Sequence, residues 1–231
     1  KIILDEAQDL LHGNYLFVIE ALLEGGLKKG EWFFFGDFKY QTIYCRGTSY
    51  DSIYDLLEDE ANFATFALTV NCRNSINVQK EMNKLVKTEV EVLNKDSNMP
   101  PVKYITFDDE SEIGIIETEI DKLVASGIEE KDITLLSPFK FERSIASKIS
   151  KYKITPVAND GDNITYSTIQ GFKGLENSVI MLLDIKTYNK PDLMYVGMSR
   201  ARNMLYVFET KHAKNYRSKL LFLSYPKLTL P

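Results

Sequence analysis

The strongest constraint on the fold is a repeated alternation between short apolar runs and segments of helical periodicity. Seven apolar runs recur, each of a length suited to a strand buried in a sheet. They are residues 2–4, 32–35, 102–107, 133–136, 164–166, 179–183 and 205–208. Such alternation is typical of α/β proteins with a mostly parallel sheet. We therefore predict an α/β fold in which helices flank a parallel sheet and ligands lie at the carboxyl ends of its strands.

The clearest helical segment is residues 112–126, with Ser111 able to cap its start and Gly127 its end. Its apolar side chains fall on one helical face. They are Ile113, Ile116, Ile120, Leu123 and Val124. Further helices are predicted over residues 74–86, 141–149 and 192–201.

Charge is unevenly distributed along the 231 residues. The net charge of −5 excludes an overall basic nucleic-acid coat, so a nucleic-acid site would be a local patch. Residues 1–66 carry 5 basic and 12 acidic side chains, whereas residues 186–231 carry 9 basic and 2 acidic ones. The basic end is either a surface that faces a polyanion or a solvated lysine-rich face.

A domain boundary is predicted where the acidic residues 58–60 give way to an apolar stretch, which divides the chain into residues 1–66 and 67–231. Cys45 and Cys72 stand alone, which indicates neither a disulfide framework nor a zinc site and favours a reducing, cytoplasmic location. No apolar run approaches the roughly 20 residues that span a bilayer. Because the chain opens directly in a strand, we expect Lys1 to lie within a longer protein.

Two apolar runs end in acidic residues. Asp5 and Glu6 follow the first run, where one carboxylate could hold Mg²⁺ through its water shell and the other could deprotonate a water. The alternative is a pair of acids that complement a helix N-terminus. Gly36 and Asp37 follow the second run, and Gln41 could contact a phosphate, although an ordinary turn explains the same pattern.

Arginine is scarce, with 6 Arg among 28 basic residues. Arg46, Arg73 and Arg200 therefore stand out, because a planar guanidinium forks onto phosphate oxygens, although surface ion pairs are the alternative. Residues 168–176 form a loop with a lysine between two glycines, whose N–H groups could approach an anion. The chain contains no G-x-x-x-x-G-K-[ST] motif.

Taken in order, five segments resemble the conserved motifs of UvrD/Rep-like superfamily 1 DNA helicases. The resemblance spans residues 2–207, with Gln170 in place of the usual His and Cys72 in place of the usual Tyr. The segments are residues 3–9 (like the Walker B box), 36–47 (like Gly-Asp…Gln…Ile-Tyr…Arg-Gly), 68–75 (like Leu…Asn-Tyr-Arg-Ser), 168–176 (like Thr-x-His-x-x-Lys-Gly-Leu-Glu) and 195–201 (like Tyr-Val-x-x-Thr-Arg-Ala).

The resemblance implies a RecA-like P-loop NTPase fold that binds ATP and Mg²⁺. Residues 1–66 would be the C-terminal part of a first motor domain, and residues 67–231 a second motor domain. Only a short loop at residues 159–162 lies where the family carries a large accessory insertion, so that insertion is expected to be missing. The phosphate-binding loop would precede Lys1, and we expect the 231-residue chain alone not to hydrolyse ATP.

The resemblance also implies roles at the nucleotide. Asp5 would hold Mg²⁺ and Glu6 would be the general base that activates water. Arg73 and Arg200 would reach the γ-phosphate, and Glu176 would bind the ribose. Gln8 and Gln41 would couple the state of the phosphate to the nucleic-acid site. Gly174 would allow the backbone to approach the nucleotide closely.

The resemblance implies that the partner is single-stranded DNA. It implies no association with a membrane. The residues facing the DNA would be Tyr44, Arg46, Thr168 and Gln170. The leading hypothesis is part of an ATP-dependent DNA helicase or translocase. One alternative is a DNA-stimulated NTPase of the same fold that acts with a nuclease, repair or defence partner without unwinding. A third is a degenerate domain kept as an interaction module.

Overall fold

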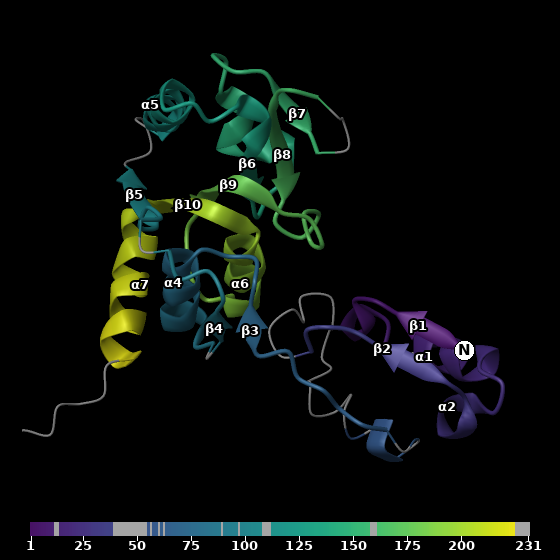
Figure 1. The fold of residues 1–231 in the computed structure, drawn as a ribbon. Helices are drawn as coiled ribbons and strands as arrows, with labels where there is room; N and C mark the ends of the chain where they lie inside the picture. Colours follow the sequence, from purple (N-terminus) through teal and green to yellow (C-terminus); the bar gives the residue numbers. More distant parts are fainter. Residues whose placement is uncertain are drawn as a thin grey trace, which may run out of the picture. The chain divides into compact units, whose positions relative to one another are not determined.

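The chain is described from a computed structural model. The structure describes residues 1–11, 14–38, 55, 57–59, 61, 63–88, 90–96, 98–107, 112–157 and 161–224. The chain divides into two compact units, Lys1–Leu68 and Thr69–Pro231. Figure 1 shows the helices and strands of each unit. The assignment of these units to two motor domains stays a prediction.

The larger unit is built around six parallel strands in the order β5, β10, β9, β6, β8, β7. They are β5 (Lys103–Phe107), β6 (Ile133–Ser137), β7 (Ile154–Pro156), β8 (Ile164–Thr168), β9 (Asn177–Ile185) and β10 (Ala201–Thr210). All but β7 contain an apolar run that the sequence singles out. The predicted α/β fold with a parallel sheet flanked by helices is therefore confirmed.

Helices cover both faces of this sheet. Figure 1 shows α4 (Ile76–Val86), α6 (Pro191–Ser199) and α7 (Lys211–Ser224) together beside β9 and β10, and α5 (Glu112–Ala125) on the opposite side. Side chains of β9 alternate between the two faces, as expected for period 2. Val179, Met181 and Leu183 join the core beneath α5, whereas Leu182 packs toward Gly197 of α6. A strand apolar on both faces is the signature of a parallel sheet covered on both sides.

The helix α5 ends as its sequence predicts. Gly127 adopts φ +93°, and its N–H donates to the carbonyl of Val124 (3.0 Å). The N–H of Ile128 donates to the carbonyl of Leu123 (3.1 Å). These two bonds satisfy carbonyls that the helix leaves open. One residue of the predicted apolar face differs, since the side chain of Val124 is 37% exposed.

The helix predicted over residues 141–149 is wrong. Two short 3₁₀ segments, η3 (Phe141–Arg143) and η4 (Ile145–Lys148), replace it, with Ser144 extended between them. The Ser144 hydroxyl donates to Asp184 of β9 (2.6 Å), and Asp184 also accepts the N–H of Ile145 (3.2 Å). These bonds to a residue about 40 positions away outweigh local helix propensity, which periodicity alone does not reveal.

Two other predicted helices have slightly different bounds. The segment expected from residue 74 begins as α4 at Ile76, and the segment expected to reach residue 201 ends as α6 at Ser199. The unit also contains elements that the sequence analysis did not predict. They are the helix α7, the strand β7, the parallel pair β3 (Val70–Asn71) and β4 (Glu91–Val92), and the 3₁₀ turn η2 (Glu130–Asp132).

The smaller unit contains the parallel strands β1 (Ile2–Leu4) and β2 (Trp32–Phe34). Around them lie the 3₁₀ turn η1 (Ala7–Asp9), α1 (Asn14–Leu22) and α2 (Gly26–Lys29). One face of the strand pair packs on a core that includes Ala7, Leu11, Ile19 and Leu27. Both strands match predicted apolar runs, whereas α1 and α2 were not predicted.

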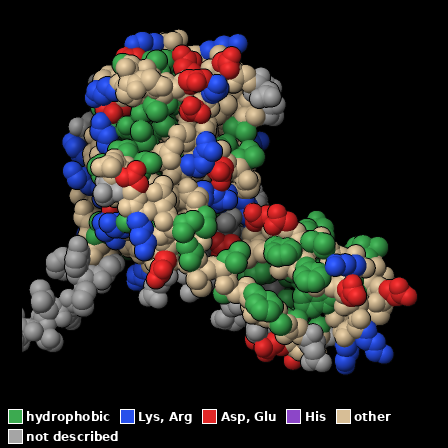
Figure 2. Space-filling model, in the orientation of Figure 1, with side chains coloured by type: hydrophobic (Ala, Val, Ile, Leu, Met, Phe, Trp, Pro, Cys, Tyr) green, Lys and Arg blue, Asp and Glu red, His purple; other side chains and the backbone are tan. Residues whose placement is uncertain are grey.

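These two strands, expected from their apolar runs to be buried, are only partly buried. Ile3 is 63% exposed and Phe33 is 51% exposed, because their side chains point away from the core on which Leu4 and Phe34 pack. Figure 2 shows hydrophobic side chains gathered on the visible face of this unit. The described residues therefore cover one face of the pair.

Candidate functional site

Three segments of the larger unit, all singled out in the sequence, meet in the fold. Residues 71–75 precede α4, residues 174–177 lead into β9, and residues 199–203 run from the last residue of α6 into the start of β10. The N–H of Ser75 donates to the carbonyl of Arg202 (2.8 Å), and the N–H of Asn177 donates to the carbonyl of Arg200 (3.1 Å). The 199–203 segment therefore holds the other two on either side, and the three together are called the three-segment site.

Arg73 and Glu176 form an ion pair within this site. Nε of Arg73 lies 2.5 Å from Oε2 of Glu176, although the two residues are 103 positions apart. The side chains are 38% and 39% exposed, so water and solutes reach both. A guanidinium that is open to solvent retains donors for a planar oxyanion such as a phosphate.

Arg200 lies deeper in the site, and follows the last residue of α6 rather than lying on the helix. Its Nε donates to the carbonyl of Val196 (3.0 Å), Nη2 to Oγ of Ser199 (2.9 Å) and Nη1 to the carbonyl of Leu175 (3.4 Å). Hydrogen bonds of this kind are what make a buried guanidinium tolerable. The bond to Leu175 places Arg200 against the residue that precedes Glu176.

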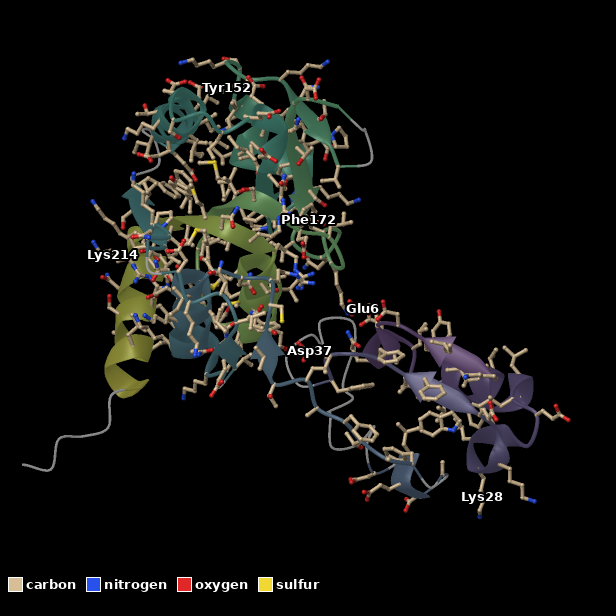
Figure 3. The ribbon with its side chains drawn as sticks, in the orientation of Figure 1. Glu6, Lys28, Asp37, Tyr152, Phe172 and Lys214 are labelled. Carbon is tan, nitrogen blue, oxygen red and sulfur yellow. The ribbon has the colours of Figure 1, made fainter. Side chains whose placement is uncertain are left out.

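The loop from β8 to β9 carries the other predicted contacts of this unit. Thr168 ends β8, and its Oγ1 accepts the N–H of Gly171 (3.0 Å). Phe172, labelled in Figure 3, is buried and anchors the middle of the loop. Gln170 is half-buried, and Gly174 is exposed with φ +83°, a conformation that favours glycine.

The smaller unit presents the predicted acids at the carboxyl end of its strand pair. Leu4 pairs with Phe34, so the residues after β1 and β2 leave the sheet at the same edge. Figure 3 shows Glu6 and Asp37 at this edge. Asp5 is exposed there, and its Oδ1 accepts the N–H of Glu6 (2.9 Å).

Glu6 adopts φ +51°, an uncommon conformation for a residue with a side chain. Nε2 of the buried Gln8 donates to Oε2 of Glu6 (2.5 Å), so this amide orients the carboxylate. A Cβ on Gly36 would lie 2.2 Å from Oε1 of Gln8. A side chain at that position would therefore displace the Gln8 amide from its present place.

Three of the predicted site residues lie outside the described residues. They are Gln41, Tyr44 and Arg46. The structure brings Arg73, Glu176 and Arg200 together in one unit and Asp5, Glu6 and Gln8 together in the other.

Sequence reasoning overlooked the roles of Asn71 and Asn74. Oδ1 of Asn71 accepts the N–H groups of Arg73 (2.8 Å) and Asn74 (3.1 Å), which shapes the turn before α4. Two asparagines within four residues, directly before a helical segment, are a signal for such a turn. That signal could have identified the pair from the sequence.

The chemistry available in the larger unit is that of an anion site with one acidic side chain. The guanidinium of Arg73 is open to solvent and can bind phosphate oxygens, whereas that of Arg200 is buried and donates to groups within the protein. The carboxylate of Glu176 can accept hydrogen bonds from sugar hydroxyls. In the smaller unit, an exposed aspartate with access to water suits Mg²⁺, which keeps several waters and takes one or two carboxylates. Asp5 could contribute one carboxylate to such a site, and no group of three or more acidic, His or Cys side chains among the described residues could hold a metal ion.

No family model matches the chain, and no curated protein matches it. Among solved structures, the chain is similar to the C-terminal domain of a possible DNA helicase from Lactobacillus plantarum WCFS1, with 12% identity and a TM-score of 0.47. That match covers 65% of this chain and 96% of the other. The PRRSV helicase matches with 14% identity and a TM-score of 0.46, over 90% of this chain and 34% of its own. Both TM-scores are below 0.5, so the function proposed below rests on the residues of the site and not on these structural likenesses.

No helix in the described part of the chain combines the length and hydropathy needed to cross a bilayer.

Proposed function

We propose that this chain is part of an ATP-dependent DNA helicase or translocase, of the UvrD/Rep-like superfamily 1 type with RecA-like motor domains. The observation that carries the proposal is the convergence of Arg73, Glu176 and Arg200, which come from three separate sequence motifs. Motifs that resembled a nucleotide site only by their order thus also meet in space. If Arg73 and Glu176 formed only a stabilising ion pair, Arg200 would not need to lie beside the loop that carries Glu176.

In this proposal the three-segment site contacts the nucleotide from the larger unit. Arg73 and Arg200 stabilise charge on the γ-phosphate in the transition state, a contribution of roughly 10³–10⁵ in rate for arginines of this kind. Glu176 accepts hydrogen bonds from the ribose. Arg73 exchanges its partner Glu176 for phosphate oxygens, which its solvent exposure permits.

The smaller unit supplies the water-activating groups. Glu6 accepts the proton of the attacking water, with its carboxylate oriented by Gln8. Asp5 would hold Mg²⁺, which when bound neutralises phosphate charge. Gln41 senses the phosphate state, and ATP hydrolysis drives stepping along one strand.

Single-stranded DNA is the proposed polymer. Thr168 and Gln170, on the loop that also carries Gly174 and Glu176, face the strand together with Tyr44 and Arg46. This loop supports coupling, because one segment of nine residues carries both nucleotide and nucleic-acid contacts. The proposed location is the cytoplasm.

The test is ATP hydrolysis by the full-length protein, with and without single-stranded DNA. Wild type should hydrolyse ATP faster with DNA, and Glu6→Gln should lower kcat by at least about 10³-fold while still binding nucleotide. Lys214→Gln, a change on an exposed position of α7 away from the proposed groups, is the control and should leave the rate unchanged. If the protein functioned without DNA and Glu6→Gln functioned like wild type, an interaction module would be favoured instead.

Strand displacement separates the two enzymatic hypotheses. Release of a labelled strand from a partial duplex supports a helicase. DNA-stimulated hydrolysis without strand release supports an NTPase that works with a nuclease, repair or defence partner. Steady-state hydrolysis by the 231-residue chain alone would contradict the expectation that it holds only half of the nucleotide site.

A further inference from the structure

Asn74 occupies an unusual position between the two arginines of the three-segment site. It directly follows Arg73 and is buried. Its Nδ2 donates to the carbonyl of Ser199 (3.0 Å) and to the carbonyl of Ala201 (2.6 Å). One amide group therefore bonds to the residues on both sides of Arg200.

The orientation of this amide is determined by its partners. The carbonyls of Ser199 and Ala201 only accept hydrogen bonds, so Nδ2 must face them. Oδ1 of Asn74 then faces Asn71, whose Nδ2 donates to it (2.7 Å). All three bonds of the Asn74 side chain are thus specified, and none is to solvent.

These bonds complete a closed circuit through the site. Arg73 pairs with Glu176, and Leu175, which precedes Glu176, accepts a hydrogen bond from Arg200. Asn74 bonds to the residues on both sides of Arg200 and directly follows Arg73 in the chain, which closes the circuit. Asn74 and Arg200 are the buried members of this circuit, and buried groups that are fully hydrogen-bonded rigidify their surroundings.

We propose that Asn74 is a positioning residue that sets the distance and relative orientation of Arg73 and Arg200. This inference rests on the proposed function for its catalytic consequence. Asn74 touches no nucleotide in this scheme and acts through the two backbone turns that it joins. Because misplacement of a transition-state contact by about 1 Å can cost 10²-fold in rate, such a clamp affects turnover more than binding.

The first experiment measures backbone hydrogen exchange in Asn74→Asp, which keeps the size of the side chain and removes both donated bonds. The amides of Ser75 and Asn177 report on the joined segments, since they donate to Arg202 and Arg200. We expect both amides to exchange at least about tenfold faster than in wild type. Asn74→Ser, which keeps one donor, should give an intermediate increase and serves if Asn74→Asp does not fold.

Gln79→Glu is the matched control. Gln79 is also buried, and its Nε2 donates two bonds, to Asn83 (2.6 Å) and Thr88 (3.2 Å). Its Oε1 also accepts from Asn71 (2.5 Å). Each variant loses two donated hydrogen bonds, which go to backbone carbonyls at Asn74 and to side-chain oxygens at Gln79. Gln79 does not bond to the Arg200 turn in the contacts described, so the reporter amides should stay within about twofold of wild type.

The second experiment compares kcat and KM for ATP in the full-length protein. Asn74→Asp should lower kcat at least about tenfold with KM within about threefold, while Gln79→Glu keeps kcat within about twofold. Equal effects of the two variants on exchange and on kcat, or no effect of Asn74→Asp on either, would overturn the positioning role. If wild type does not hydrolyse ATP, the proposed function fails, and the exchange measurement alone decides whether Asn74 joins the two turns.

Discussion

Water reaches the Arg73–Glu176 ion pair but hardly reaches a second ion pair of the larger unit, Arg217–Glu209. The side chain of Glu209 is fully buried, and Arg217 contacts it through Nε (3.0 Å) and Nη2 (2.6 Å). Tyr188 adds a hydrogen bond to the same carboxylate (2.6 Å). The two ion pairs therefore differ in their effect on the free energy of unfolding, because the loss of water around the charges decides what an ion pair contributes to stability.

Glu176→Gln should change the free energy of unfolding by less than about 1 kcal/mol, because a half-exposed ion pair contributes little. Urea denaturation of the purified protein measures this. In the full-length protein the same variant should weaken ATP binding, since the residue is proposed to bind the ribose. A stability loss well above about 1 kcal/mol would indicate that the pair has mainly a structural role.

Arg217→Met should lower the free energy of unfolding by about 3–5 kcal/mol, because it leaves the carboxylate of Glu209 buried without its cationic partner. The double variant with Glu209→Gln should recover part of that loss. Midpoints of urea denaturation give both values. If single and double variants were equally unstable, lost packing rather than an unpaired charge would be the cause.

At the scale of elements, α5 and the segment at residues 141–149 show where sequence patterns suffice. The bounds of α5 follow from local signals, namely periodicity and a glycine in the left-handed conformation. Residues 141–149 have a similar apolar pattern, but Asp184 draws Ser144 out of any helix. A long-range hydrogen bond leaves no trace in local periodicity, so this element could not be predicted.

Two glycines, one inside α5 and one just after it, should respond to alanine with opposite signs. At Gly127, alanine would have to adopt φ +93°, so Gly127→Ala should destabilise the protein by about 1 kcal/mol. Gly114 lies within the helix, and a methyl group added there would meet no atom within 4 Å. Gly114→Ala should therefore stabilise the protein by about 0.5–1 kcal/mol. Thermal melts of both variants provide the measurement, and equal signs would contradict the backbone explanation.

At the scale of the whole molecule, five tyrosines among the described residues have a raised pKa. Burial is the largest cause at each of them, because it disfavours the phenolate. They are Tyr104, Tyr152, Tyr166, Tyr188 and Tyr206. All lie in the larger unit, where Tyr188 and Tyr104 also face the negative charge of glutamates.

Stability should therefore fall as the pH rises above about 10. Tyrosines in the unfolded chain ionise near about pH 10, whereas the folded state keeps them neutral, so the unfolded state binds fewer protons there. Burial and the hydrogen bond to Asp121 raise the pKa of Tyr152 to about 12, which places the loss of its contribution between its ordinary value of 10.0 and about pH 12. Tyr152→Phe should show a shallower decline in urea denaturation over this range, and an unchanged slope would contradict this.

Much of the candidate site could be predicted from the sequence, because its charged residues stand out by type or by place. Asp5 follows an apolar run, Arg73 and Arg200 are among only six arginines, and Glu176 lies in a segment that resembles a helicase motif. The ion pair between Arg73 and Glu176 was not, because it joins residues 103 positions apart. The clamp at Asn74 was also missed, since its partners are backbone carbonyls that any residue type provides.

By itself, the sequence determined the fold class, five of the six strands of the main sheet and the identity of the charged groups. These properties depend on hydrophobic periodicity and residue chemistry, which are local. Only the tertiary structure decided that Arg200 is buried, that Arg73 is paired and that one face of the smaller sheet is exposed. Burial and pairing are properties of packing between distant segments, and hydrogen bonds to backbone carbonyls far along the chain carry no local sequence signature.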